Sequence, residues 1–337
     1  MRFATYNVEW FNNLFDNAGN MLDDDRWSGR YNVKRNRQLA AIASVFKAMD
    51  ADAIMLIEAP DENRRRSTVR ALEGFAAHYG LRTSKALLGF ENDTQQEIAL
   101  LYDPAAITVT HDPQGELDDP KAPRFDGAFS FDLDTDAHPE LVTWSKPPLE
   151  IAATVPSGRK LRLIGVHAKS KAPHGARNEA EAIRIAIENR RKQLAQCVWL
   201  RRRVDQVLAA GDDLIVMGDF NDGPGLDEYE KLFGHSGIEV VLGEGDSIPL
   251  YDPHAKMALS RRVGALPSTS RFKIGPDGTY LQALLDYIMI SPELTKAIPR
   301  WRIWHPFDNP ACFDDPELRE ALIDASDHFP VTIDLDL

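Results

Sequence analysis

One stretch of the sequence places a carboxylate and an amide directly after a short apolar run. The apolar residues 214–217 lead through Gly218 to Asp219, Phe220 and Asn221. This pattern predicts a buried strand that stops at the glycine. Side chains alternate along an extended segment, so Asp219 and Asn221 project to the same side while Phe220 turns into the core. An acid and an amide aimed at one target suit a hard cation, a phosphate or an attacking water.

The same stretch also has a purely structural interpretation. Residues 219–224 contain Asp, Asn, Gly and Pro, which are the residues that turns prefer. An EF-hand loop is excluded, because its glycine stands sixth from the first aspartate, whereas Gly223 stands fifth from Asp219. A turn and a catalytic site therefore remain two open interpretations, and polar residues elsewhere in the chain must decide between them.

Other polar residues that could do chemistry stand near the ends of predicted strands. With the two already named, they are Asn7, Glu58, His167, Asp219, Asn221, Asp286, Asp327 and His328. Taken singly, His167 could be a hydrogen-bonded residue at a strand edge, Glu58 a helix cap or surface acid, and Asp286 a buried ion-pair partner. In a sandwich of two sheets, strand ends can converge at one rim. We therefore predict that these side chains meet there.

The hydrophobic pattern predicts which elements carry these residues. Besides the strand before Gly218, strands are expected at residues 2–10, 53–57, 81–88, 97–102, 128–133, 150–155, 159–166, 284–290 and 301–304, with a last one near residue 331. Helices are expected from Val33 to Met49 and over residues 64–78 and 176–209. Short strands with few helices between them predict a four-layer α/β sandwich, in which helices flank two packed mixed β-sheets.

The long helix at 176–209 carries several basic residues, namely Arg190, Arg191, Lys192 and residues 201–203. We interpret them as its solvated face, with a nucleic-acid contact as the alternative. The whole chain, residues 1–337, is expected to be one domain, because no linker divides it and no second compact core is visible. Residues 110–145 and 243–278 are interpreted as insertions on the fold.

Composition limits the classes of function. Apolar residues make up 43% of the chain, which is ample for a full core, and no apolar run approaches the length of a membrane span. The start of the chain lacks the features of a secretory signal, so we expect a cytoplasmic protein. Cys197 and Cys312 are far apart and indicate neither a disulfide framework nor a thiolate metal site. The net charge of −13 argues against a broad basic surface but leaves a local basic groove possible.

Several short motifs follow one another along nearly the whole chain. They are Tyr6-Asn7-Val8, Leu56-Ile57-Glu58, the segment from Glu97 to Tyr102, Lys146-Pro147-Pro148-Leu149, Gly165-Val166-His167, Gly218-Asp219-Phe220-Asn221, Leu285-Asp286-Tyr287-Ile288 and the segment from Ser326 to Val331. In this order the sequence resembles the endonuclease/exonuclease/phosphatase superfamily, and it is identified as a bacterial-type member. Gly-Asp-Phe-Asn together with the C-terminal Ser-Asp-His-x-Pro is the most specific part of the resemblance. It implies the DNase I-like fold.

The resemblance also implies roles for these residues. Glu58, helped by Asn7 and Asp327, would bind Mg²⁺, and Mn²⁺ would satisfy the same oxygen ligands. His328 would accept the proton of the attacking water, and an acid at the position of Glu97 would hold such a histidine in the useful tautomer. His167, oriented by Asp286, would donate to the phosphate or leaving group, and Asp219 and Asn221 would hold the water and a phosphate oxygen in line. Neighbouring carboxylates are expected to raise the pKa of both histidines.

The substrate remains open between three hypotheses. The first is a metal-dependent phosphodiesterase that cuts nucleic acid, as an endonuclease or exonuclease. Lys146, Lys169 and Lys171 are candidate ligands of a substrate phosphate, with a solvated loop pair as the alternative for Lys169 and Lys171. The second is a phosphatase or phosphodiesterase on inositol phosphates, sphingomyelin or other small or lipid phosphoesters. Pro60 stands where nuclease relatives often have Arg, and Lys146 also replaces an Arg, which favours the second. The third is a catalytically inactive binding module, although no protein partner is indicated.

Overall fold

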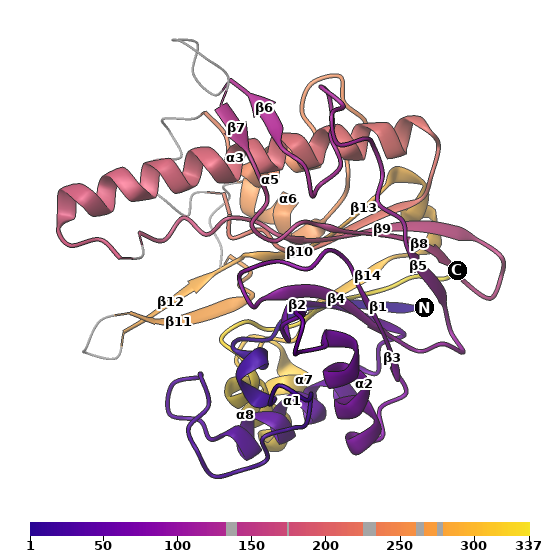
Figure 1. Cartoon of the computed structure of the whole chain (residues 1–337). Helices are drawn as coiled ribbons and strands as arrows, with labels where there is room; N and C mark the ends of the chain where they lie inside the picture. Colours follow the sequence, from indigo (N-terminus) through magenta and orange to yellow (C-terminus); the bar gives the residue numbers. More distant parts are fainter. Residues whose placement is uncertain (133–139, 174, 225–233, 261–265, 275–278) are drawn as a thin grey trace.

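The computed structural model describes residues 1–132, 140–173, 175–224, 234–260, 266–274 and 279–337. Within these residues, two β-sheets pack face to face and helices cover their outer faces (Figure 1). This confirms the predicted four-layer α/β sandwich. Gly225, the last residue of the strand expected at 128–133 and parts of both expected insertions lie outside the described residues.

Two sheets of different size form the centre. The first has the order β14 (Arg300–Ile303), β15 (Val331–Asp334), β1 (Arg2–Asn7), β2 (Ala53–Ala59), β4 (Glu97–Tyr102) and β3 (Lys85–Leu88). The second has the order β13 (Asp286–Ile290), β10 (Leu214–Asp219), β9 (Lys160–His167), β8 (Leu149–Thr154) and β5 (Thr108–His111). Each sheet holds one parallel pair, β1 with β2 and β9 with β10, among antiparallel neighbours. Both sheets are therefore mixed, as predicted.

Apolar layers lie on both faces of each sheet. Between the sheets, buried residues such as Met55, Leu100 and Leu163 form the central layer. Because β2 and β10 are covered on both faces, their apolar residues run continuously instead of alternating with polar ones. This burial fixes where each strand ends, and so where the polar residue that follows it must stand.

Within the described residues, helices cover the outer faces of both sheets (Figure 1). On the first sheet lie α1 (Arg35–Met49), α2 (Thr68–Tyr79) and α8 (Pro316–Ala325). On the second lie α3 (Glu179–Ala209), α5 (Gly237–Leu242) and α6 (Pro253–Leu259). A further short helix, α7 (Pro310–Phe313), and two 3-10 turns at Phe11–Leu14 and Pro292–Ala297 complete the described helices. No helix in these described ranges combines the length and apolarity needed to cross a membrane.

The solvated face expected for the long helix is wrong at three positions. Arg190, Arg201 and Arg203 are buried in α3. The Nη2 of Arg203 donates to the carbonyl of Ala122 at 3.0 Å, and its Nε lies 3.1 Å from a carboxylate oxygen of Glu150. The segment after β5 lies over the helix and supplies carbonyl acceptors that periodicity alone could not reveal. Buried arginines with such partners are satisfied rather than solvated.

Parts of the two expected insertions are ordered and packed. In the first, β6 (Phe129–Phe131) pairs with β7 (Glu140–Val142), and Phe129 stacks on Trp199 of α3 at 5.4 Å between ring centroids. In the second, α6 is followed by β11 (Ser270–Ile274), which pairs with β12 (Thr279–Ala283) in a hairpin. Neither β7 nor this hairpin was predicted, because three- to five-residue strands carry little periodic signal.

Candidate active site

A cleft of about 1330 Å³ opens where the ends of the two sheets meet. Of the twelve residues singled out from the sequence, ten line it: Asn7, Glu58, Lys146, His167, Lys169, Lys171, Asp219, Asn221, Asp327 and His328. The remaining two are Asp286, buried behind His328, and Glu97, which lies outside the cleft lining. Residues from positions 7 to 328 therefore meet at one rim, as the strand ends suggested.

Asp219 lies at the centre of this arrangement. The side-chain amide of Asn7 donates to its Oδ2 at 3.0 Å, and the backbone N–H of Asn221 donates to its Oδ1 at 2.7 Å. Two imidazoles approach the same Oδ2, with Nε2 of His167 at 3.8 Å and Nε2 of His328 at 3.9 Å. Burial raises the pKa of Asp219 to about 7. The carboxylate is thus held by fixed donors between two possible proton carriers.

Local backbone geometry explains why Asp219 can sit there. Gly218 has a φ of 143°, and a Cβ at this position would lie 2.0 Å from the carbonyl oxygen of Val166 on β9. Only glycine allows β10 to come this close to its neighbour. Asn221 adopts a φ of 50°, and its side-chain amide donates to the carbonyl of Ala168 at 3.1 Å. Residues 219–221 therefore form a turn and also carry side chains of the site, so the two interpretations of this stretch hold together.

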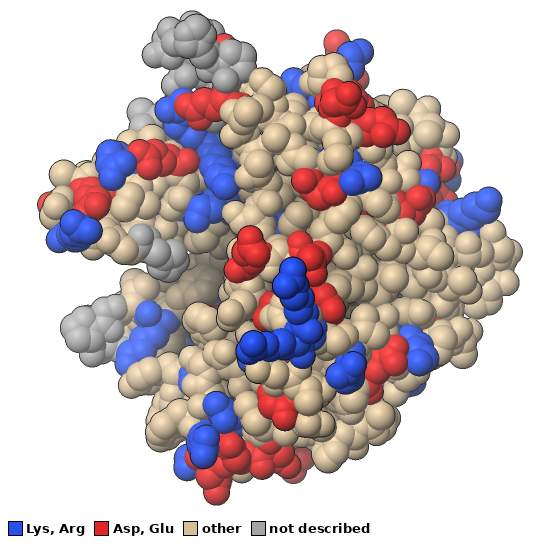
Figure 2. All heavy atoms as spheres, viewed as in Figure 1, with Lys and Arg blue, Asp and Glu red and all other residues tan. Residues whose placement is uncertain are grey.

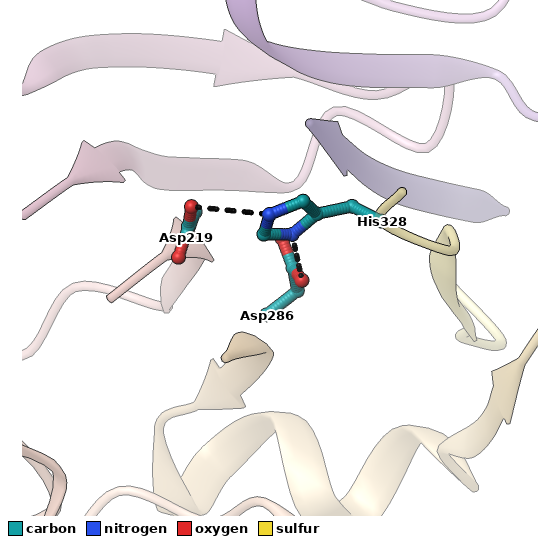
Figure 3. A group of neighbouring side chains, drawn as sticks. All are labelled: Asp219, Asp286 and His328. Carbon is teal, nitrogen blue, oxygen red and sulfur yellow. Dashed lines mark hydrogen bonds and ion pairs between the residues drawn. The ribbon is translucent and has the colours of Figure 1, made fainter. Parts of the chain in front are cut away.

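The partner of Asp286 differs from the one expected. Its Oδ2 lies 2.7 Å from Nδ1 of His328, whereas the resemblance had paired it with His167 (Figure 3). The cause is the hairpin, which was not foreseen. The backbone N–H of Arg271 on β11 donates to the carbonyl of Asp327 at 2.7 Å, and this holds the neighbouring His328 over β13, where Asp286 begins the strand.

His167 has a different neighbour. Nζ of Lys146 lies 3.3 Å from its Nε2, and its Nδ1 is buried without a hydrogen-bond partner among the residues described. The ammonium group can only donate, so Nε2 of His167 is the acceptor in this contact. Nε2 of His167 therefore lies between the ammonium of Lys146 and the carboxylate of Asp219, whereas the expected partner Asp286 pairs with His328.

The two histidines consequently shift in opposite directions. Burial lowers the pKa of His167, and the charge of Lys146 lowers it further, well below its usual value. For His328, burial acts in the same direction, but the carboxylates of Asp286 and Asp219 outweigh it and raise the pKa well above its usual value. The expectation that both pKa values rise is wrong for His167, because its burial lowers the pKa and the cation of Lys146 adds to that effect.

Glu97 does not take the place assigned to it. Its Oε2 accepts from the side chain of Asn92 at 2.6 Å, and its Oε1 accepts from the backbone of Glu62 at 3.4 Å. Burial raises its pKa to about 8. The contact of His328 with a carboxylate is made by Asp286 instead, because β4 carries Glu97 to the far side of β2. Glu97 therefore fixes a loop at the edge of the cleft.

The proposed cation ligands have the chemistry that a hard divalent ion needs. At the end of β2 the register shifts between Ile57 and Ala59, and Glu58 adopts a φ of 62°, which turns it out of the ladder at a bulge. Oδ1 of Asn7 is buried without a hydrogen-bond partner in the described chain. Burial raises the pKa of Glu58, and raises that of Asp327 to about 7. An orphaned amide oxygen beside poorly solvated carboxylates fits a bound cation.

A second group of side chains could also hold an ion. Ligand atoms of Asp219, Asp286 and His328 lie within 4.8 Å of one another (Figure 3). However, this set includes an imidazole whose Nδ1 already binds Asp286, whereas Glu58, Asn7 and Asp327 offer oxygen alone. Magnesium and manganese prefer oxygen ligands, so Glu58, Asn7 and Asp327 fit the expected ions better.

One buried acid of the site was overlooked in the sequence. Asp222 is fully buried, and its Oδ1 accepts from Nζ of Lys171 at 2.5 Å, while its Oδ2 accepts from the backbone of Gly237 at 2.5 Å. It fixes Lys171 at the cleft wall. Asp222 is the last residue of Asp-Phe-Asn-Asp, so its place just after the strand marks it as a site candidate, although a turn alone also explains an aspartate there. Lys169 also lines the cleft, and its backbone N–H donates to Gln196 at 2.9 Å.

Comparison with protein families matches residues 4–328 to the endonuclease/exonuclease/phosphatase family. The chain belongs to this family. The match spans every site residue from Asn7 to His328, and it makes the protein a phosphoester hydrolase by class. No curated protein sequence matches the chain.

Solved structures share the fold of this family member. Truncated TDP2 from Caenorhabditis elegans is 15% identical with a TM-score of 0.51, and the match covers 98% of this chain and 96% of that one. An AP endonuclease from Archaeoglobus fulgidus is 13% identical with a TM-score of 0.50 over the whole of both chains. At these identities the likeness shows the fold alone.

Proposed function

We propose that this family member is a divalent-metal-dependent phosphodiesterase that uses His328 as the general base for in-line attack by water. The observation that carries the proposal is the set of contacts around Asp219, which joins two imidazoles, the amide of Asn7 and the backbone of Asn221 in one cleft. These are the groups that hydrolysis of a phosphoester requires, because water must be deprotonated and the phosphate oxygens must meet fixed donors.

Each residue of the chain then has a defined task. Asp286 holds Nδ1 of His328, so Nε2 remains to accept the proton of water. Asn221 and Asp219 align that water with the phosphorus atom. Lys146, held against His167, places a cation and an imidazole beside the phosphate oxygens.

A divalent cation held by Glu58, Asn7 and Asp327 would neutralise charge on the phosphate and polarise the bond to phosphorus. The stronger interpretation of these residues is therefore catalysis, and a purely binding role would leave the paired His328 and Asp286 without a task. Magnesium and manganese are the ions that this oxygen set favours.

Nucleic acid is the first candidate substrate. The cleft exceeds the size usual for small-molecule sites, and Lys146, Lys169 and Lys171 line it, so an extended polyanion has cations to meet there. A lipid-derived or other small phosphoester is the second candidate. It is favoured by the apolar residues that share the cleft lining and by the net charge of −13.

The experiment that tests the function offers several phosphoesters to the Mg²⁺-loaded protein in parallel. Plasmid DNA, single-stranded DNA, RNA, bis-p-nitrophenyl phosphate and inositol phosphates each report a different class. Cleavage of bis-p-nitrophenyl phosphate that depends on a divalent ion is the expected result. Turnover of inositol phosphates with intact nucleic acids would remove the first candidate, and binding without cleavage of any phosphoester would leave a non-catalytic module.

A further inference from the structure

The cleft consists of two chemically different parts. Its inner part holds the acids, amides, imidazoles and lysines of the site. Its outer part, here called the vestibule, lies between α3 and the β11–β12 hairpin, where Figure 2 shows the surface hollowed. The vestibule is lined by Ala182, Ile183 and Ala186 of α3 and by Phe272, Ile274 and Leu281 of the hairpin.

The wall formed by α3 is apolar, although its side chains are exposed or half-buried. Residues 179–189 of this helix include no buried side chain, and Figure 1 shows the helix extending past the sheet that it covers. Three isoleucines nevertheless lie in this stretch, and Ile183 has 40% of its surface exposed. A helix face that is exposed to solvent is expected to be polar. Of the three isoleucines, Ile183 lines the cleft, so it offers an exposed apolar side chain to a group that enters there.

The opposite wall has the same character. Phe272 and Leu281 are paired in the hairpin register and face the cleft with Ile274, and the exposed fractions of Ile274 and Leu281 are 45% and 43%. The other face of the hairpin carries charge, since the guanidinium of Arg271 lies 3.6 Å from the ring centroid of Tyr280. Because side chains alternate along the strands, the apolar ones lie on the cleft side of the hairpin.

The vestibule is continuous with the catalytic residues. The ring of Phe272 lies 5.4 Å from that of His328, edge to face. An apolar group esterified to the reacting phosphate would therefore pass Phe272 and continue between the two walls. Of the cleft lysines, Lys146 lies beside the catalytic residues, with its Nζ 3.3 Å from Nε2 of His167, and can meet the reacting phosphate.

We propose that the vestibule binds an alkyl or acyl chain, so that the substrate is an amphiphilic phosphodiester with one apolar ester group. This proposal rests on the proposed phosphodiesterase function and selects its second candidate substrate. Five of the six wall residues named are aliphatic, which suits a hydrocarbon chain, whereas a row of nucleobases would call for aromatic platforms. A chain that fills the space between the walls removes apolar surface from water on both partners.

The test measures binding without turnover. A series of n-alkylphosphonates from methyl to octyl is titrated into the full-length protein with Mg²⁺ by calorimetry, below micelle-forming concentrations. Each buried methylene is expected to tighten binding about fourfold. The double variant Ile183→Ser and Leu281→Ser should flatten this dependence on chain length. Tyr280→Ser, on the outer face of the same hairpin, is the matched control and should retain it.

Three outcomes overturn the proposal. In the first, the affinity of the parent protein for the phosphonates does not depend on chain length. In the second, the double variant shows the same dependence on chain length as the parent. In the third, the parent is a dimer that dissociates in the double variant, and its affinity does not depend on chain length. The last would assign the two walls to a second copy of the chain. Phosphonates are not hydrolysed, so failure to cleave methyl p-nitrophenyl phosphate would refute the proposed function while the chain-length result stands on its own.

Discussion

The side chain of Asp219 lies among most of the groups proposed to act in catalysis. Its surroundings show how burial changes the pKa of an acid in the site. It is 1% exposed, and two neutral donors hold its oxygens. Burial without a full counter-charge raises its pKa, as it does for Glu58 and Asp327. The acids of the cleft are thus poised to accept a cation or a proton, which is the state that hydrolysis of a phosphoester exploits.

Removing either central group should abolish most activity. We expect Asp219→Ala and His328→Ala each to lower turnover of bis-p-nitrophenyl phosphate at least about a hundredfold, because a positioned proton carrier or charge stabiliser has that effect. Initial rates at saturating Mg²⁺ measure the loss, with circular dichroism to verify the fold. His78→Ala, an exposed histidine on α2, is the control. Near-normal rates in either site variant would remove that residue from the mechanism.

The pairing of His328 with Asp286 predicts a pH effect. The carboxylate raises the pKa of His328, and a general base works only when it is unprotonated, so activity should fall as pH drops through that value. Asp286→Asn removes the charge and lowers the pKa of His328. The acidic limb of kcat/KM should therefore move to lower pH in the variant, even though its maximum rate also drops. A limb that stays in place or moves to higher pH would contradict the assignment.

Strand ends and short connections, rather than loops alone, position the site. Asp219, His167 and Asp286 lie opposite one another across the neighbouring strands β9, β10 and β13. The bulge in β2 turns Glu58 into the cleft, and the β11–β12 hairpin holds the segment of His328. Residues on strands are held by ladder hydrogen bonds, so they keep the close geometry that proton transfer needs.

The close approach of β9 and β10 can be tested through Gly218. Gly218→Ala would place a Cβ 2.0 Å from a backbone carbonyl at a φ of 143°, so we expect it to lower the free energy of unfolding by at least about 2 kcal/mol. Urea unfolding measures the change. Gly74→Ala, in α2 with nothing within 4 Å of the added methyl, is the matched control and should raise stability by about 1 kcal/mol. Equal effects of the two substitutions would disprove the steric argument.

Taken as one object, the sandwich brings together residues that are as far apart in sequence as Asn7 and His328. Both sheets contribute, since Asn7 and Glu58 come from the first and His167 and Asp219 from the second. The cleft is therefore formed only when the two sheets pack. Binding of a ligand to groups from both sheets should stabilise their association, because it favours the native state over the unfolded one.

Metal binding should consequently be visible as stability. Mg²⁺ at about a hundred times its dissociation constant should raise the free energy of unfolding by about 2.7 kcal/mol. Chelation should remove both this gain and the activity, and Mn²⁺ should restore them. Glu58→Gln is expected to weaken the effect, whereas Glu97→Gln, a buried acid outside the cleft lining, should keep it. Thermal unfolding at several Mg²⁺ concentrations measures this, and equal loss in both variants would refute the ligand assignment.

Residue types and their order were sufficient for the architecture and for most of the cleft. Apolar runs that end on Glu58, His167 and Asp219 marked the strand ends, and strand ends in a sandwich must gather at a rim. The order of the motifs indicated the family, because each motif is a short local segment that can be read without the tertiary structure.

Pairings across the cleft needed the folded chain. Asp286 contacts His328 rather than His167, because the hairpin sets the position of residues 327–328. Lys146 stands beside His167, a contact that no local pattern records. The buried arginines of α3 depend in the same way on carbonyls that come from distant segments. Sequence pattern records which residues are apolar or polar, but a contact between two polar groups depends on the packing of elements that share no local signal.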